Sequence, residues 1–153
     1  MDAKDYQIIK ELQRDGRLTN QELSERVNLS PSPCLRRVRN LEKAGILKGY
    51  AAVVDERAFG LSMTAFVRIT LERHSGEAAT AFEQGVQGID EVVDCYVMAG
   101  GTDYLLRVLV PDLQSYERFI RNRLHKIKGI ASIDTGFAYG VVKQSTVFPD
   151  IPR

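Results

Sequence analysis

The stretch RLTNQELSERVNLSPSPCLRRVRNLEKAGILKGY, residues 17–50, decides the fold of the first part of the chain. Thr19 is followed three residues later by Glu22, a spacing typical of a capping box in which each side chain bonds the backbone amide of the other residue. An Asn-Leu-Ser segment interrupts the helix that this box begins. Its serine, Ser30, followed by Pro31, suits the start of a second helix.

The second helix carries an apolar stripe on one face and basic residues on the opposite face. Leu35, Val38 and Leu41 recur every three residues and are expected to pack inward, and Gly45 suits the end of the helix. Two helices around a short turn are typical of a helix-turn-helix, which places its second helix in the major groove of DNA. We therefore expect DNA contacts from the residues on and beside the polar face, namely Ser32, Pro33, Cys34, Arg36, Arg37, Arg39, Asn40 and Lys43.

The start of this helix is expected to lie nearest to the base edges, because a helix-turn-helix presents the N-terminal part of its recognition helix there. Arg36 and Arg37 can each bond O6 and N7 of a guanine, at about 1–3 kcal/mol of discrimination per pair. Arg39, Lys43 and Lys48 are expected at phosphates. The alternative, a solvated charged face, is disfavoured because the caps, the turn and the stripe occur together.

The basic charge of the chain is concentrated in the same stretch. The whole chain is almost neutral, with 21 Lys/Arg and 20 Asp/Glu. Residues 30–50, by contrast, hold five basic residues and one acidic residue. A small basic patch in each protomer suits a protein that binds double-stranded DNA as an oligomer and adds phosphate contacts from several copies.

Several classes of protein are excluded by what the sequence lacks. The first residues, MDAKDYQII, are not a secretion signal, so a cytoplasmic protein is expected. No apolar run is long enough to cross a bilayer, so no membrane partner is expected. Cys34 and Cys95 lack metal-ligand spacing, and we expect neither a disulfide nor a metal nor another cofactor. Cys95 is expected in a core strand. Cys34 lies at a helix start, where backbone amides can lower the pKa of a thiol, and a low thiol pKa is what a redox switch requires.

The periodicity of the sequence changes after residues 51–61, which are expected to form a short strand and a linker between a DNA-binding domain at 1–50 and a second domain at 62–153. Strand-like alternation and helical patterns follow in the order β-α-β-β-α-β, at 63–71, 77–86, 92–98, 103–110, 112–127 and 130–139, with a further strand expected at 141–147. This order is the ferredoxin-like plan, so the fold class is α+β. The sheet face without helices is expected to pack on the same face of a second copy, giving a dimer.

The connection between the second and third of these strands reads Met-Ala-Gly-Gly-Thr-Asp-Tyr, residues 98–104. Adjacent glycines permit positive φ angles and close approach of a ligand. Amides exposed there can bind a carboxylate, and Asp103 can accept from an ammonium group, which together suit a free amino acid. On composition alone, an ordinary hairpin turn is the favoured interpretation.

Two segments resemble one known family. SPSPCLRRVRNLEKAGILKGY is similar to the recognition helix and exit strand of the Lrp/AsnC transcriptional regulators, and MAGGTDYLLRVLVPDLQSYERF is similar to their ligand-domain core, with a Gly-x-x-Asp-Tyr signature. The resemblance covers essentially the whole chain. It implies a winged-helix-like helix-turn-helix followed by a ferredoxin-like RAM domain, dimers that assemble into octamers, and an amino-acid effector held at contacts between dimers. The residues implied at the effector are Gly100, Gly101, Thr102, Asp103 and Tyr104, with Thr135 from a neighbouring strand.

The predicted function is a sequence-specific transcriptional regulator whose DNA binding is modulated by a small effector, an amino acid. The effector is expected to favour one assembly over another and so to change the spacing at which recognition helices are presented. An architectural protein that wraps DNA with little effector control is the alternative. An enzyme of amino-acid metabolism is disfavoured, because the sequence has no catalytic constellation.

Overall fold

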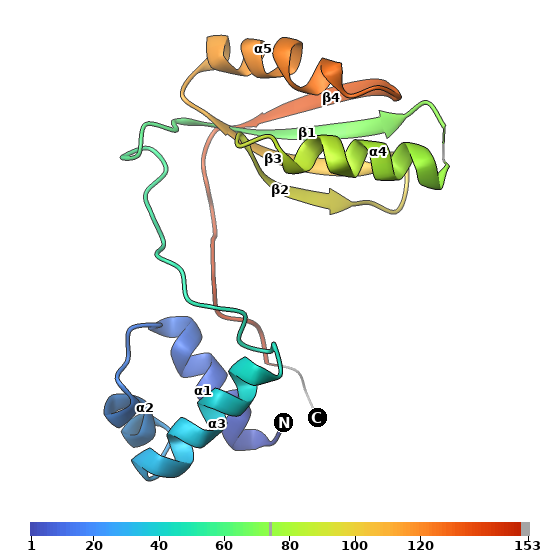
Figure 1. Cartoon of the computed structure of the whole chain (residues 1–153). Coiled ribbons are helices and arrows are strands. Elements are labelled where there is room, and N and C mark those ends of the chain that lie inside the picture. Colours follow the sequence, from blue (N-terminus) through green and yellow to red (C-terminus); the bar gives the residue numbers. More distant parts are fainter. Residues whose placement is uncertain (74, 151–153) are drawn as a thin grey trace. The chain divides into compact units, whose positions relative to one another are not determined.

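The computed structural model describes residues 1–73 and 75–150, and these form two compact units (Figure 1). One unit contains Met1–Val53 together with residues 142–150, and the other runs Val54–Val141. The chain therefore passes twice from one unit to the other. Residues 142–150, which we expected in the second domain, lie with the first unit instead.

The first unit is built on helices α1 (Ala3–Arg14), α2 (Asn20–Arg26) and α3 (Pro31–Lys43). Each helix turns an apolar side toward a common core, because burying these side chains is what holds short helices together. The buried members of this core are Ile8, Leu12, Leu23, Val27, Cys34 and Leu41.

The helix ends are set by local residues. Thr19 accepts a hydrogen bond from the amide of Glu22, and the Glu22 carboxylate accepts one from the amide of Thr19 at 2.7 Å, so the predicted capping box is confirmed. Ser30 is the N-cap of α3, although its side chain makes no capping hydrogen bond. Gly45 follows the C-cap of α3 with φ +68°, a left-handed conformation that favours glycine.

The end of the described chain packs on α1. The Thr146 hydroxyl donates to the backbone oxygen of Gln13 at 3.1 Å, and the Phe148 amide donates to Oε1 of Gln13 at 3.3 Å. Lys10, which also lies on α1, forms an ion pair with Asp150. Residues 146–150 are therefore part of the first unit, although they follow the whole second unit in the chain.

The short strand expected within residues 51–61 and the strand expected at 141–147 are both wrong. Neither segment is a strand, and both consist mainly of exposed residues. A strand needs a hydrogen-bonding neighbour, and the sheet of the second unit ends at strands that pair with neither segment.

The second unit follows the predicted β-α-β-β-α-β order. Its elements are β1 (Met63–Leu71), α4 (Gly76–Gln87), β2 (Val92–Val97), β3 (Tyr104–Val110), α5 (Leu113–Asn122), the 3-10 turn η1 (Leu124–Lys126) and β4 (Ile130–Ala138). The strands form one antiparallel sheet in the order β2-β3-β1-β4. This arrangement confirms the ferredoxin-like α+β fold, with the two βαβ crossovers interleaved.

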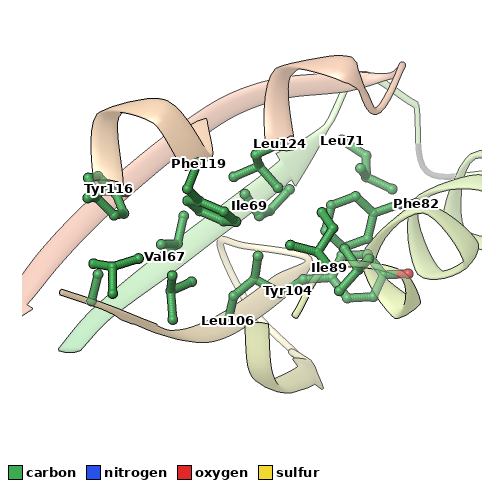
Figure 2. Close-up of a cluster of buried hydrophobic side chains, with 14 residues drawn as sticks. Val67, Ile69, Leu71, Phe82, Ile89, Tyr104, Leu106, Tyr116, Phe119 and Leu124 are labelled. Atoms are coloured by element: carbon green, nitrogen blue, oxygen red, sulfur yellow. The ribbon is translucent and has the colours of Figure 1, made fainter. Parts of the chain in front are cut away.

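Helices α4 and α5 cover one face of this sheet. The inward residues of β1 and β3 are almost completely buried against them, with Phe82 from α4 and Phe119 from α5 filling the space between (Figure 2). The strict alternation along β1 is what separates the two faces. On the uncovered face, Phe66 is 37% exposed and Tyr96 is 53% exposed.

Cys95 differs from its expected place in the core, because it is exposed. It lies on β2, an edge strand of the sheet, which has a neighbouring strand on one side only. Alternation along the sequence does not distinguish an edge strand from a central one.

Candidate DNA-binding helix and ligand loop

Helix α3 presents one polar face to solvent. Arg36, Arg39, Asn40 and Lys43 are exposed, and Ser32 lies one turn before them on the same side. Pro33 is half-buried beside this face. These residues follow the helical spacing of three and four, so the structure brings most of the predicted DNA-contacting set onto a single surface.

Cys34 does not belong to this surface. Its side chain is completely buried in the core of the first unit, so the expectation that it contacts DNA is wrong. Cys34 and Leu41 are seven residues apart, which places both on the inward side of the helix. Leu35, expected inward, is instead 37% exposed. Burial also raises the pKa of the Cys34 thiol, which opposes the thiolate that a redox switch requires.

Arg37 is held by the protein itself. Its Nη1 lies 2.7 Å from Oδ1 of Asp5 and 2.8 Å from Oδ2 of Asp2, both at the start of α1. The hydrogen bonds that the guanidinium donates to the two carboxylates, that to Asp5 first, raise its pKa above the ordinary value. Arg37 therefore ties α3 to α1, and its expected contact with a base stays a prediction.

The loop between β2 and β3 is fastened at its two ends. The Met98 amide donates to the backbone oxygen of Asp103 at 2.8 Å, and the Asp103 amide donates to the backbone oxygen of Ile69 at 2.9 Å. Oδ2 of Asp103 accepts from the amide of Leu71 at 2.7 Å. Asp103 thus joins the loop to the end of β1, a contact that the sequence pattern did not indicate.

The middle of this loop is open. Gly100 and Gly101 are exposed, and among the described residues no atom beyond the glycine and its two chain neighbours lies within 4 Å of the position that a Cβ of either residue would take. Gly100 has φ +129°, which lies in the region that favours glycine. Thr102 is half-buried next to them. The backbone is therefore accessible to a ligand, as the sequence indicated.

Tyr104 lies beneath the loop in the core. It is 3% exposed and lies beside Phe82 in the buried cluster (Figure 2), with the two ring centroids 4.5 Å apart. Its hydroxyl donates to Oε1 of Glu83 at 2.9 Å. Burial, together with the Glu83 carboxylate, raises the pKa of Tyr104 to about 12. Within one protomer Tyr104 supports the loop from below and does not line it, so the expected ligand contact is corrected. Glu83, on α4, had no signal in the sequence.

Thr135 is not brought to the loop. It pairs with Val67 in the middle of β1, on the side of that strand opposite to β3. Its Oγ1 lies 2.5 Å from the hydroxyl of Tyr116 on α5. Thr135 therefore faces the helix layer, and its expected ligand contact is not supported within one protomer.

The described residues offer neither a metal-ligand cluster nor a membrane-spanning helix. Within residues 1–73 and 75–150, no group of three or more His, Cys, Asp or Glu side chains is arranged to hold a metal ion. Over the same ranges, no helix combines the length and apolar character needed to cross a membrane.

Each of the two units is matched by the model of a known protein family. Residues 64–148 match the Lrp/AsnC ligand binding domain, and residues 1–48 match a winged helix-turn-helix DNA-binding domain. The first match spans more than half of the chain. It includes the whole β2–β3 loop and both helices of the second unit.

Individual proteins are similar over almost the full length. The leucine-responsive regulatory protein of Escherichia coli is 40% identical over 145 residues, which cover 95% of this chain and 88% of that protein. A transcriptional regulator of Neisseria meningitidis, solved as its complex with L-Met, superposes with a TM-score of 0.92 at 39% identity, covering 97% of this chain and 96% of that one. An AsnC family regulator of Agrobacterium tumefaciens gives a TM-score of 0.91 at 36% identity, with 97% of each chain covered.

Proposed function

Because this chain belongs to the Lrp/AsnC family of DNA-binding transcriptional regulators, we propose that a free amino acid at the β2–β3 loop controls how its helix-turn-helix engages DNA. The family consists of regulators and not of enzymes. The chain carries both a DNA-binding domain and a ligand-binding domain. What remains to be assigned is the effector and the residues that hold it.

The open backbone at Gly100 and Gly101 is the observation that carries the proposal. A ligand carboxylate can approach these amides closely, because both glycines are exposed and have open space on the side where a Cβ would lie. Among the described residues, the amides of Gly100, Gly101 and Thr102 make no backbone hydrogen bond, so they are available as donors. Asp103 holds the loop in place through Leu71 and adds a negative charge, which favours the ammonium group of the same ligand.

The class of effector is supported by the relatives. The Neisseria protein is a complex with L-Met, and the Escherichia coli protein is named for its response to leucine. Both compounds are amino acids with apolar side chains. We therefore propose an amino acid of this kind for the present chain.

A second protomer completes the proposed site. Residues 98–101 are exposed, so a ligand there keeps one side in solvent within a single chain. Ligand sites normally bury most of the ligand. We propose that the open sheet face, which exposes Phe66 and Tyr96, forms a dimer, and that contacts between dimers, as in an octamer, close over the loop. The effector then changes the spacing of the α3 helices.

At the DNA, we propose that the exposed face of α3 contacts the major groove, with Pro33 at its margin. Arginines at positions 36 and 39 supply the chemistry for guanine edges or phosphates. The residues in this proposal are Ser32, Pro33, Arg36, Arg39, Asn40 and Lys43. The protein is proposed to act in the cytoplasm, where DNA and free amino acids meet.

A thermal-shift screen of the full chain against the twenty amino acids tests the effector proposal. A ligand that binds only the folded state stabilises it by about 2.7 kcal/mol at a hundredfold excess over its dissociation constant. Gly101→Val should abolish the shift without unfolding the protein, since Gly101 is exposed and has open space around it. Gly140→Val, at an exposed glycine with equally open space, is the matched control and should keep the shift.

Two outcomes contradict the proposal. If an amino acid raises the melting temperature of Gly101→Val as much as that of wild type, the ligand binds elsewhere in the chain. No shift with any amino acid favours the architectural alternative, in which the protein wraps DNA without effector control.

A further inference from the structure

The segment from α5 to the start of β4 is opposite in charge to the rest of its unit. Residues 113–130 contain five Lys/Arg and one Asp/Glu, a net charge of +4. The remaining residues of the unit, 54–112 and 131–141, contain four Lys/Arg and eleven Asp/Glu, a net charge of −7. The basic residues are therefore gathered on one part of an acidic domain.

Arg123, Lys126 and Lys128 lie together around one pocket of about 460 Å³, with Asn122 beside them. We define these four residues as the basic cluster. All four are exposed. A pocket rimmed by three cations and an amide can accept the oxygens of a phosphate group.

The position of the basic cluster is fixed by close packing of η1 on α4. A Cβ at Gly85 would lie 3.0 Å from the side chain of Ile127, so a larger residue there would require Ile127 to move away by a few tenths of an ångström. Leu124 is completely buried in the same turn. The two lysines at 126 and 128 therefore stand on a rigid support and not on a free loop.

Among the described residues, the charged groups of the basic cluster have no acidic partner in an ion pair, in contrast to a neighbouring arginine. Arg121 pairs with Glu117 at 2.6 Å, and Arg118 donates to Oγ of Ser115 at 3.0 Å. In the part of the chain that the structure describes, Arg123, Lys126 and Lys128 make no ion pair. Cations held close together without an acidic partner repel one another, and an external anion relieves that repulsion.

One acidic group lies nearby and limits where an anion can bind. Glu91 lines a neighbouring pocket of about 280 Å³ together with Arg118, and this pocket shares Asn122 and Arg123 with the first. The carboxylate disfavours a phosphate at that end. The lysine end of the cluster is the more favourable position.

We propose that the basic cluster binds the phosphate backbone of double-stranded DNA that flanks the site read by α3. DNA is already the macromolecule of this family, so the proposal rests on DNA binding by the first unit and not on the identity of the effector. Lysine and arginine at phosphates add affinity without reading sequence. The acidic remainder of the unit repels DNA, which confines the contact to this cluster.

Titrations of the full-length protein with two duplexes test the proposal. One duplex is about 20 base pairs, enough for two half-sites one helical turn apart, and the other extends it with flanking DNA to about 150 base pairs, roughly one persistence length. Lys126→Ala/Lys128→Ala is compared with Arg57→Ala/Arg73→Ala, which removes the same charge from exposed positions of the same unit. The measured quantity is the slope of log Kd against log salt concentration.

On the long duplex, Lys126→Ala/Lys128→Ala should make the slope shallower by up to about 1.8 for each protomer that contacts flanking DNA, since each lost phosphate contact removes about 0.9. On the short duplex its slope should equal that of wild type. Arg57→Ala/Arg73→Ala should match wild type on both duplexes. Lys126→Arg/Lys128→Arg keeps the charge and should restore the slope, and it also guards against a folding defect.

Three results would overturn the proposal. The first is an unchanged slope on the long duplex. The second is an equal loss in the control variant, which reduces the effect to net charge. The third is evidence that the basic cluster has another role. Altered sedimentation of Lys126→Ala/Lys128→Ala without DNA assigns the cluster to a protein contact. Saturable binding of inorganic phosphate at the cluster, with no change in slope, assigns it to a free anion.

Discussion

Tyr104→Phe separates packing from ligand binding at the signature loop. The substitution removes only the hydroxyl that donates to Glu83 at 2.9 Å and keeps the ring that packs 4.5 Å from Phe82. A hydrogen bond to a charged group contributes about 1.5–3 kcal/mol, and the exposed Glu83 carboxylate regains water when the bond is lost. We therefore expect a loss of about 1–1.5 kcal/mol in the free energy of unfolding.

In a domain of this size, such a loss lowers the melting temperature by about 4–12 °C. Tyr104→Ala removes the ring as well and should cost about 3–5 kcal/mol. Neither the dissociation constant of the effector nor its stoichiometry should change in Tyr104→Phe, measured by isothermal titration calorimetry. Tyr96→Phe, at a tyrosine that is 53% exposed, is the control and should melt like wild type.

The same residue predicts a pH dependence. Its pKa is about 12 in the folded protein against 10.0 for an unperturbed tyrosine. Between these values the unfolded state releases the proton while the folded state keeps it, so stability is intact below pH 10 and falls as pH rises toward 12. Thermal melts across this range should show a steeper decline for wild type than for Tyr104→Phe. A Tyr104→Phe variant that melts normally but no longer binds the effector would refute the packing role.

The remaining predictions concern the first unit. Arg36→Ala should weaken DNA binding about tenfold or more with an unchanged melting temperature, since this side chain is exposed. Arg37→Ala should weaken DNA binding and also lower the melting temperature, because it breaks contacts to Asp2 and Asp5. An Arg37→Ala protein that melts like wild type would contradict this. The Cys34 thiol should react with a thiol reagent far more slowly than exposed Cys95, and equal rates would show that the core opens readily. Deleting residues 144–150 should reduce protection of α1 amides in hydrogen exchange, whereas unaltered protection would mean that the contacts to Gln13 contribute nothing.

Local patterns predicted most of the fold. The Thr19 and Glu22 pair forms its capping box, and the alternation from Met63 to Leu71 forms a strand with one buried side. These features depend on neighbours within a few residues, which a sequence displays directly. The expected strand at 141–147 failed because a strand also requires a partner, and alternation does not name one.

The errors at α3 have a geometric cause. Residues three apart drift by about 60° around a helix, whereas residues seven apart differ by only about 20°. The inward direction is therefore marked by Cys34 and Leu41 together, and Leu35 falls outside it. The capture of Arg37 by Asp2 and Asp5 joins residues far apart in the sequence, which periodicity does not reveal.

At the ligand loop, the sequence identified the open glycines but not the role of the tyrosine. Tyr104 occupies the same alternating positions as Leu106, Val108 and Val110, all inward, and this pattern was the available signal that it is buried. Asp103 was expected to face a ligand, but its contact with Leu71 depends on how β1 and β3 pair.

The return of residues 146–150 to α1 has a consequence for the order in which the protein matures on the ribosome. The DNA-binding unit begins the chain but receives its last pieces, including the partners of Gln13 and Lys10, only after the whole of Val54–Val141 has been made. At translation rates of about 5–20 residues per second, this delay is roughly 4–18 s. All residues of the ligand-binding unit have thus been made before the first unit receives its contacts from residues 146–150.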